Sequence, residues 1–584
     1  MDRIIKNTFL RGSVSVISSK SAAHRVMICA AAADKKTRVY GLNNSADVVA
    51  TRQCLTALGA EFKDESGGYC TVTPIRFGGN PTGGFSNRSI TASSRANITS
   101  VSKGENGRNA ENAIASAQAG IKTLEAVFIN SPQSFPISDL RIKENGRTNA
   151  DSETEERARS SGIVNITPPN AGAETEISER ENNTENGCGA SVILNCRESG
   201  STLRFLLPFA AALGADAEFR TEGRLSERPI YGFIGALEKN GVKIVKNGGV
   251  VSLRGVLSGG KFAVDGSVSS QFVSGLLMAL PCVGGGVIDA GKNAESRGYV
   301  DITLGIMEKF GVKIVRGGDL SDCARKNTGK SVAADGKNGD YTVNGGGFNL
   351  RGGNFEAGPA FEGEGKNNAE CSVVADGRNG IYTVSGSGFR SPGEISIEGD
   401  WSNAAFFIVA AIFNGNIILN NLDLNSAQPD REIVNIIRRM GGKISLKNGG
   451  VVVKKSALEG TEIDAQGIPD IIPVLSLAAG AAKGRTTVVN AGRLRIKECD
   501  RLRASADMLN ALGAKTEILG DTLVIDGIGG RFRGAVLDGH NDHRMVMCAA
   551  AAAFNSDGPI EITGAEAVGK SYPDFFEDLE KLTK

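Results

Sequence analysis

Neither sign of charge is in excess in this chain, in which Lys and Arg total 66 and Asp and Glu total 65. This balance excludes the broad basic field that attracts nucleic acid, so anion binding must come from local clusters of cations. The sequence also lacks an apolar run long enough to span a membrane and an N-terminal apolar stretch typical of a secretory signal. We therefore expect a cytoplasmic protein with neither a nucleic-acid nor a membrane partner.

Several motifs that would carry a known chemistry are missing as well. The 10 cysteines are scattered and form no C-x-x-C pair, which disfavours a zinc site or a disulfide framework. The sequence has no G-x-x-x-x-G-K-[ST] loop, no helix-opening G-x-G-x-x-G, no H-E-x-x-H and no G-x-S-x-G elbow. Nucleotide hydrolysis, hydride transfer and zinc or serine hydrolysis lose support, and we expect neither a metal nor another cofactor.

What the sequence does contain is an internal repeat. Each copy has a short apolar stretch, a polar turn of Gly, Ser or Asp, and a helix-forming run rich in Ala and Leu. The spacing from Gly200 to Ser270, from Asp400 to Asp470 and from Asp470 to Asp542 is 70, 70 and 72 residues. The six copies lie at 16–33, 198–215, 265–282, 398–413, 467–484 and 539–554.

Strand-forming segments with central turns lie between these helices, at 243–255, 443–455 and 515–527, and predict β-hairpins. Each repeat is thus a mixed unit of helices and antiparallel strands. Two polar insertions interrupt the period, at about 77–189 and at about 317–371. The first is rich in Asn, Ser, Glu, Arg and Gly, a composition that buries little apolar surface, and we expect both insertions to be surface decoration.

The polar turns are candidate anion sites, because each opens a helix with free backbone N–H groups and the positive end of the helix dipole. Ordinary helix capping by Ser or Asp explains any single turn equally well. Cations in or beside several turns favour one shared anion-binding cleft instead. They are Lys20, Arg25, Arg204, Arg228, Lys497, Arg501, Arg544 and Lys570.

Three residues are candidates for proton transfer. Asp470 lies between apolar residues and two prolines, where it is either a base or a helix N-cap. Glu498 lies between Lys497 and Arg501, where it is either an ionised acid–base group or half of an intrahelical ion pair with Arg501. His543 is open between a proton carrier, a substrate ligand and a capping residue. Two bound anions with an acid and a base indicate group transfer between small phosphorylated metabolites.

Nine segments occur in the order seen in the 5-enolpyruvylshikimate-3-phosphate synthase family, which the chain resembles from end to end apart from the insertions. These segments are SSKSAAHR, ESGSTLRF, SERPI, DGSVSSQF, IEGDWS, GIPD, RIKECDRL, NDHRM and GKSYPDFF. The resemblance implies an α+β fold, a two-lobed inside-out α/β barrel of six βαβαββ-like units with three per lobe. It places residues 1–17 and 398–584 in the C-terminal lobe and residues 18–397, with both insertions, in the N-terminal lobe.

The resemblance also implies the reaction and its residues. The enolpyruvyl group of phosphoenolpyruvate would pass to the 5-hydroxyl of shikimate 3-phosphate, with Asp470, Glu498, Lys20 and His543 as catalytic residues. Two sets of binding residues follow. Shikimate 3-phosphate would contact Lys20, Ser21, Arg25, Ser269, Ser270, Gln271, Ser296, Asp470 and Lys497. Phosphoenolpyruvate would contact Lys20, Gly200, Arg228, Gln271, Arg501, Arg544 and Lys570.

The chain departs from the family pattern at two places. Glu198-Ser199-Gly200-Ser201 stands where many relatives carry Asn-Ala-Gly-Thr, and Arg493 stands where an Asn often contacts the shikimate phosphate. The small Gly200 implies sensitivity to glyphosate. Two alternatives remain, an enolpyruvyl transferase for UDP-N-acetylglucosamine and a silent scaffold of the same fold. We expect a monomer whose partners are its two small substrates.

Overall fold

The repeat seen in the sequence appears in the computed structural model as a recurring sheet. The structure describes residues 2–76, 191–291, 297–316, 341–342, 349–350, 380–447 and 450–584. Ser296 and most of the two predicted insertions lie outside these described residues. In five four-stranded sheets, the first pair of strands is parallel and the next two pairs are antiparallel.

Three of these sheets are built from the first two-thirds of the chain. They are β16 (Glu394–Ser396), β3 (Thr37–Tyr40), β5 (Tyr69–Thr73) and β4 (Glu61–Glu65); β6 (Val192–Arg197), β7 (Ala217–Thr221), β9 (Val250–Gly255) and β8 (Val242–Asn247); and β10 (Gly260–Ala263), β11 (Gly285–Asp289), β15 (Ile381–Ser385) and β12 (Ile314–Arg316). The late strand β16 pairs with the early strand β3, so the chain returns to its first repeat.

The remaining three large sheets are built from the last third of the chain, and two of them also take a strand from its N-terminal end, β2 or β1. They are β2 (Leu10–Ser15), β17 (Gly415–Asn420), β19 (Gly450–Lys454) and β18 (Lys443–Lys447); β20 (Glu462–Asp464), β21 (Lys483–Val489), β23 (Thr522–Ile528) and β22 (Lys515–Leu519); and the three-stranded β24 (Ala535–Asp538), β25 (Ile560–Thr563) and β1 (Arg3–Ile5). A separate short pair joins β13 (Tyr341–Thr342) and β14 (Asn349–Leu350). All three predicted hairpins are confirmed, as β8–β9, β18–β19 and β22–β23.

The six predicted repeat helices are also present. They are α1 (Lys20–Ala31), α5 (Gly200–Ala212), α7 (Ser270–Ala279), α10 (Trp401–Asn414), α12 (Ile472–Ala481) and α14 (His543–Ala552). Almost every residue of these helices is buried, because the Ala- and Leu-rich sequences are apolar on all sides and lie inside the sheets. Gly275 of α7 permits close packing, since a Cβ there would lie 2.5 Å from the carbonyl oxygen of Arg204 in α5.

A second set of helices packs beside the first. They are α2 (Ala46–Ala57), α6 (Tyr231–Glu238), α8 (Arg297–Lys309), α11 (Ile433–Arg439), α13 (Arg501–Leu512) and α15 (Phe575–Lys581). The repeat therefore reads β–α–β–α–β–β, as in β6, α5, β7, α6, β8 and β9. The predicted α+β fold of repeated mixed units is confirmed. Among the described helices, none combines the length and the apolar character that crossing a bilayer requires.

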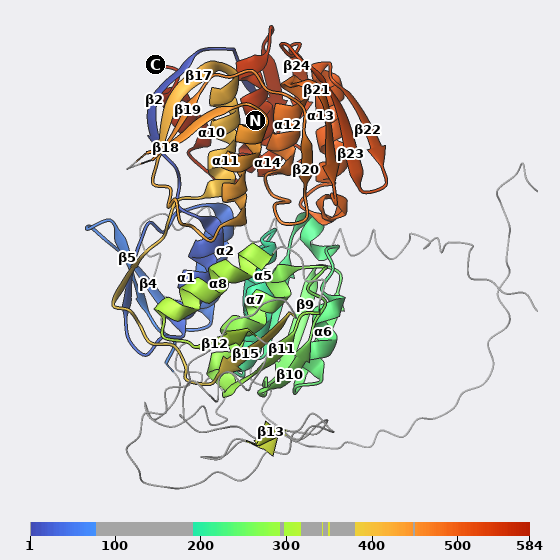
Figure 1. The fold of residues 1–584 in the computed structure, drawn as a ribbon. Coiled ribbons are helices and arrows are strands. Elements are labelled where there is room, and N and C mark those ends of the chain that lie inside the picture. Colours follow the sequence, from blue (N-terminus) through green and yellow to red (C-terminus); the bar gives the residue numbers. More distant parts are fainter. Residues whose placement is uncertain are drawn as a thin grey trace, which may run out of the picture. The chain divides into compact units, whose positions relative to one another are not determined.

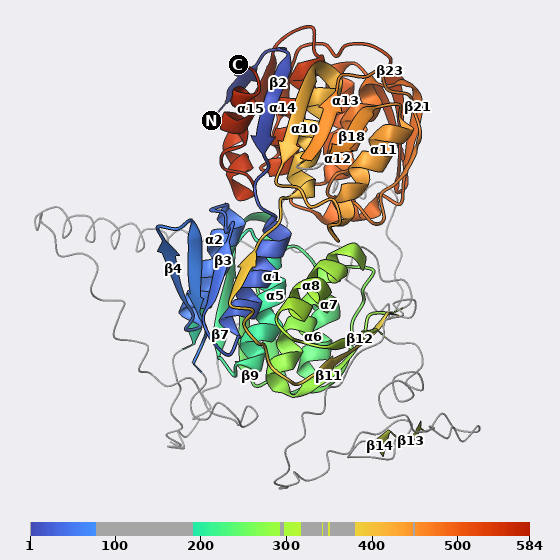
Figure 2. The same cartoon turned by 60° about the vertical axis from the view of Figure 1, so that its left-hand side comes forward.

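The helices and sheets form two separate hydrophobic cores. One core is drawn from residues 22–397, and the other from residues 10–16 together with residues 401–582. We call the elements packed around these cores the first lobe and the second lobe. Figure 1 shows α1, α5, α7 and α8 grouped in the first lobe and α10, α12, α13 and α14 grouped in the second. Figure 2 shows β3, β4, β7 and β9 beside the helices of the first lobe. The lobe boundaries at residues 17 and 397 stay a prediction.

Candidate functional site

Residues at or beside the starts of all six repeat helices line a single pocket. The first lobe contributes Lys20, Ser21, Arg25, Asp47, Gly200, Ser201, Arg204, Arg228, Pro229, Val268, Ser269, Ser270, Gln271 and Tyr299. The second lobe contributes Asp400, Ser402, Pro469, Asp470, Arg493, Ile496, Lys497, Glu498, Arg501, His543 and Arg544. Because helix N-termini carry free N–H groups and positive dipole ends, their convergence here favours anions.

Most of these helices begin with a side-chain cap. The caps are Ser19, Ser199, Ser269, Asp400 and Asp542, each of which accepts a hydrogen bond from the backbone N–H of the second or third residue of its helix. The fifth helix differs, because its N-cap is Ile471 and has no side-chain bond. The N-cap interpretation of Asp470 is therefore wrong. Its carboxylate is left for the cations of the pocket.

The carboxylate of Asp470 contacts three cationic side chains. One carboxylate oxygen is 3.1 Å from Nζ of Lys497 and 3.0 Å from Nη1 of Arg501, and the other is 3.1 Å from Nη2 of Arg544. Burial opposes ionisation, but Arg544, Lys497 and Arg501 together hold the pKa of Asp470 well below its usual range. Asp470 is thus a carboxylate at neutral pH and can accept a proton.

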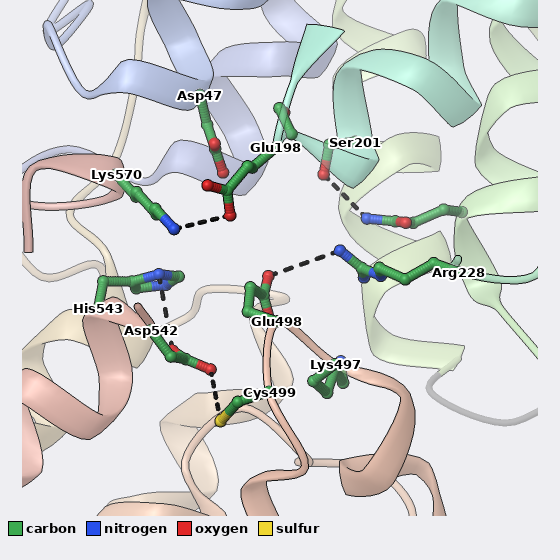
Figure 3. A network of polar contacts seen from close by, with 12 residues as sticks. Asp47, Glu198, Ser201, Arg228, Lys497, Glu498, Cys499, Asp542, His543 and Lys570 are labelled. Carbon is green, nitrogen blue, oxygen red and sulfur yellow. Dashed lines mark hydrogen bonds and ion pairs between the residues drawn. The ribbon is translucent and has the colours of Figure 1, made fainter. Parts of the chain in front are cut away.

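Glu498 pairs with Arg501 at 2.7 Å, as the spacing predicted, yet the pair is not intrahelical. Helix α13 begins only at Arg501, behind the N-cap Asp500, so Glu498 lies on the preceding loop. Its other oxygen is 3.8 Å from Nη1 of Arg228, which belongs to the first lobe (Figure 3). Burial opposes ionisation of Glu498, but Arg501 and Arg228 hold its pKa well below the usual range.

Arg501 joins the acidic groups of the second lobe. Its side chain is 1% exposed, and it donates to both oxygens of the fully buried Asp542 at 2.8 and 3.1 Å. It also reaches Glu498 and Asp470. A buried guanidinium shared by three carboxylates fixes their relative positions. Arg501 therefore positions two of the three proton-transfer candidates, Asp470 and Glu498.

Three arginines carry open donors at the pocket. Nε of Arg204, Nε of Arg228, and Nε and Nη1 of Arg544 are buried without a hydrogen-bond partner in the described part of the chain. Buried N–H groups are nearly always bonded, so these donors indicate a site for an anionic ligand. Arg204 otherwise donates to the amide oxygen of Gln271 at 2.7 Å, and that amide donates to Ser201 at 2.9 Å.

The first lobe holds further polar groups in place. The ammonium of Lys20 lies 2.8 Å from Asp47, and the backbone N–H of Lys20 donates to Asp400 of the second lobe at 3.0 Å. Arg25 donates to Thr303 at 2.6 Å and to the carbonyl of Ser21 at 2.6 Å. Burial lowers the pKa of Arg25 to about 10, so it remains charged at neutral pH.

His543 is a neutral imidazole on the pocket wall. Burial, followed by Lys20 and Arg544, lowers its pKa well below the usual value. Neither ring nitrogen has a hydrogen-bond partner among the described residues. Asp542 caps the helix that His543 opens, so the capping interpretation of His543 is wrong. Proton carrier and substrate ligand remain open.

The structure brings nearly all of the predicted site residues together. Ser296 falls outside the described residues, and Lys570 is absent from the pocket lining. The ammonium of Lys570 instead contacts Glu198 at 2.8 Å (Figure 3). It also donates to the carbonyl of Asn541 at 2.6 Å. Arg493, which had no assigned role, lies on the wall.

Sequence reasoning missed a cluster between the lobes. The hydroxyl of Tyr299 lies 3.0 Å from Asp430 and 3.3 Å from Asp470, and Ser402 also bonds Asp430. Burial raises the pKa of Asp430 to about 6, and Asp470 acts in the same direction. Asp47 was also missed. No motif marks these residues, because they meet only through the fold. Within the described ranges, no group of three or more His, Cys, Asp or Glu is placed to hold a metal ion.

Comparisons with known proteins point to one family. The model of the family described as EPSP synthase (3-phosphoshikimate 1-carboxyvinyltransferase) matches residues 4–84, 159–330 and 367–579. A relative named 3-phosphoshikimate 1-carboxyvinyltransferase, from Clostridium botulinum (strain Alaska E43 / Type E3), is 35% identical over 394 residues, which cover 67% of this chain and 77% of the relative. One of the same name from Clostridium beijerinckii is 29% identical over 578 residues, which cover 98% and 95%.

Solved structures share the fold. EPSP synthase from Acinetobacter baumannii superposes with a TM-score of 0.58 at 19% identity, covering 100% of this chain and 98% of that one. The enolpyruvyl transferase NikO from Streptomyces tendae gives a TM-score of 0.56 at 14% identity, covering 99% and 96%. At this identity, the likeness establishes the architecture alone.

Proposed function

The chain belongs to the EPSP synthase (3-phosphoshikimate 1-carboxyvinyltransferase) family, and we propose that it transfers the enolpyruvyl group of phosphoenolpyruvate to the 5-hydroxyl of shikimate 3-phosphate, releasing phosphate. One observation carries the proposal. Six helix starts, six arginines and the two ionised carboxylates of Asp470 and Glu498 line the same pocket. Such a site suits two anionic substrates and a proton transfer between them.

The shikimate 3-phosphate side would lie mainly on the first lobe. Ser269 and Ser270, at the start of α7, offer hydroxyl and backbone donors to a phosphate. Arg25 and Ser21 would bind the carboxylate, and Gln271 would lie against the ring. From the second lobe, Lys497 would contact the substrate beside Asp470. Ser296 keeps its proposed phosphate contact as a prediction.

The phosphoenolpyruvate side would use the open guanidinium donors. Arg228 and Arg544 carry buried N–H groups without a hydrogen-bond partner among the residues that the structure describes, and Gly200 leaves room for an anion beside Arg228. Lys20 would touch both substrates, because it belongs to the first helix start and lies beside the second lobe through Asp400. Arg501 and Lys570 complete the proposed set, and Gln271 borders both substrates.

The chemistry is an addition followed by an elimination. The 5-hydroxyl oxygen bonds to C2 of phosphoenolpyruvate while its proton passes to Asp470, and the ammonium of Lys20 adds a proton to C3, the carbon from which the ionised Glu498 would later accept a proton. The resulting tetrahedral intermediate loses phosphate by breaking the C2–O bond, and a proton leaves C3 to restore the double bond. Asp470 and Glu498 stabilise positive charge at C2, and the arginines stabilise the departing phosphate. For His543, we propose a role as proton carrier or as substrate ligand.

The two lobes have complementary tasks in this account. Each supplies part of both subsites, so closure would assemble the site and exclude water from the enol phosphate. Neither subsite needs a residue from a second chain, and we propose a monomer that acts in the cytoplasm.

A phosphate-release assay tests the proposal. Phosphate should form only when both phosphoenolpyruvate and shikimate 3-phosphate are present. Release with UDP-N-acetylglucosamine in place of shikimate 3-phosphate would favour the sibling enolpyruvyl transferase. The absence of release with either acceptor would favour a silent scaffold.

Gly200→Ala is expected to weaken phosphoenolpyruvate binding. A Cβ at this position would lie 2.8 Å from Nη1 of Arg204 and 2.9 Å from Nη1 of Arg228, so both guanidinium groups must move. We expect the KM for phosphoenolpyruvate to rise about tenfold, as for a displaced charged hydrogen bond. Glyphosate should inhibit the parent enzyme and lose potency against the variant. Gly235→Ala is the matched control, because a Cβ there meets nothing within 4 Å.

Two outcomes would contradict the predictions for Gly200. Parent activity that persists in millimolar glyphosate would refute the expected sensitivity. An unchanged KM in Gly200→Ala would mean that the guanidinium groups do not border the substrate.

The affinity for shikimate 3-phosphate should fall at alkaline pH. Burial lowers the pKa of Lys497 to about 8, with Arg493 and Arg501 acting the same way and Asp470 opposing. Above this pH, Lys497 loses the positive charge that would bind the substrate. We expect kcat/KM for shikimate 3-phosphate to decline as the pH rises through about 8. This alkaline limb of the pH profile reflects the pKa of a group in the free enzyme. Lys497→Met should lower the maximum kcat/KM and abolish the alkaline decline. If the variant shows the same decline, a group other than Lys497 causes it.

A further inference from the structure

Glu198 links the two lobes through polar contacts with Lys570 and Asn541, and we call these contacts the clasp. This first-lobe carboxylate lies 2.8 Å from Nζ of Lys570, which is 372 residues further along the chain in the second lobe. It also accepts from the side-chain amide of Asn541, with contacts of 3.1 and 3.4 Å to its two oxygens. The side chains of Glu198 and Lys570 are 25% and 16% exposed, so the pair is largely shielded from solvent.

The backbone holds Glu198 firmly. Strand β6 ends with a register shift, and Arg197 adopts a left-handed conformation with φ of 52°. Ser199 follows as the N-cap of α5, so Glu198 is confined between an irregular strand end and a capped helix. Its carboxyl carbon packs over Gly223, where a Cβ would lie only 2.8 Å away. The carboxylate therefore has one well-defined place, two residues before Gly200.

This arrangement restricts the ammonium of Lys570. An ammonium has three N–H donors, and those of Lys570 serve Glu198 and the carbonyl of Asn541, the latter at 2.6 Å. The Asn541 carbonyl is in the same lobe as Lys570, so among the described residues only Glu198 ties the ammonium to the lobe that carries Gly200 and Arg228. Figure 3 shows Lys570 directed at Glu198, with Arg228 and Glu498 nearby.

We propose that Glu198 is a positioning residue: its carboxylate holds Lys570 across the lobe boundary, so that the third N–H of the ammonium is set for phosphoenolpyruvate. The inference rests on the proposed function, in which Lys570 binds this substrate. It gives a role to the glutamate that stands where many relatives carry asparagine. A charged acceptor at this place holds an ammonium more strongly than an amide does.

Glu198→Gln tests the inference, because it keeps the side-chain shape and removes the charge. We expect the KM for phosphoenolpyruvate to rise about tenfold. This is the effect of losing one charged hydrogen bond, reduced because the pair is partly exposed to solvent. The dissociation constant of shikimate 3-phosphate, measured by calorimetry without phosphoenolpyruvate, should stay within about twofold. A general loss of folding would change both constants and lower the unfolding temperature.

Two further variants sharpen the result. Asn541 has φ of 50°, a conformation that glycine adopts freely, so Asn541→Gly removes the amide donor without backbone strain. This variant should raise the KM for phosphoenolpyruvate in the same direction, by about threefold, since one neutral donor is lost. Glu218→Gln is the matched control, because Glu218 pairs with Arg220 at 3.5 Å on strand β7 of the same lobe and lies outside the pocket lining. Its kinetic constants should equal those of the parent.

The outcomes separate the inference from the proposed function. If the parent releases phosphate with both substrates but Glu198→Gln has an unchanged or lower KM for phosphoenolpyruvate, the clasp is overturned. A lower KM would mean that Glu198 competes with the substrate for Lys570. Failure of the parent to release phosphate would overturn the proposed function instead.

Discussion

Replacing Asp470 by asparagine is expected to reduce kcat by about three orders of magnitude, within the range that a positioned general base contributes. The variant keeps the size of the side chain but cannot take the proton of the 5-hydroxyl. It also removes the negative charge that Lys497, Arg501 and Arg544 share. Single-turnover phosphate release measures the effect without a contribution from product release.

A matched control is available on the same segment. Asp464 accepts from the backbone of Gln466 at 2.9 Å and lies on an exposed strand end, outside the pocket lining. Asp464→Asn should retain full turnover. A fall in kcat of less than about tenfold in Asp470→Asn would show that another group takes the proton, since a base contributes more than that.

Replacing Arg501 by methionine is expected to destabilise the protein by about 3–5 kcal/mol, the typical result of breaking a buried ion pair from one side. The side chain of Arg501 is 1% exposed, and that of Asp542 is 0% exposed. Without the guanidinium, the buried Asp542 would have no cationic side-chain partner in the described part of the chain. Glu498 would also lose its contact at 2.7 Å, so turnover should fall as well.

Denaturant unfolding measures this loss of stability. Arg503→Met is the control, because Arg503 lies on the same helix with its side chain 69% exposed and pairs with Asp507 at 3.1 Å. An exposed pair of this kind contributes about 0.5 kcal/mol or less. Equal effects in the two variants would contradict the structural role assigned to the buried Arg501 network.

The repeats were predictable because each one has a recognisable pattern within a short stretch of sequence. Small apolar helices after polar turns, and hairpins around Asn-Gly or Gly-Asp turns, leave a pattern in a few neighbouring residues. The same turns predicted a shared anion-binding cleft, since cations recur at equivalent points. The pairing of β2 with β17, or of β16 with β3, has no local signal. It depends on how complete repeats close on one another.

The fine structure of the site was less predictable for the same reason. A polar residue before a helix is usually an N-cap. Asp470 instead pairs with Lys497, Arg501 and Arg544, which the fold brings close to it. The Tyr299–Asp430 contact spans 131 residues and the Glu198–Lys570 contact spans 372, so neither leaves a motif. Burial of these groups follows from lobe contacts that composition does not reveal.

The fate of the bridging oxygen of phosphoenolpyruvate tests the central claim most directly. The parent enzyme would be given shikimate 3-phosphate and phosphoenolpyruvate labelled with oxygen-18 between C2 and phosphorus, and the released phosphate would be weighed by mass spectrometry. A site that joins both anions and expels phosphate from C2 predicts that the label leaves with the phosphate, in step with formation of an enol ether. Label retained in pyruvate, with shikimate 3-phosphate unchanged, would show simple hydrolysis at phosphorus and contradict the account.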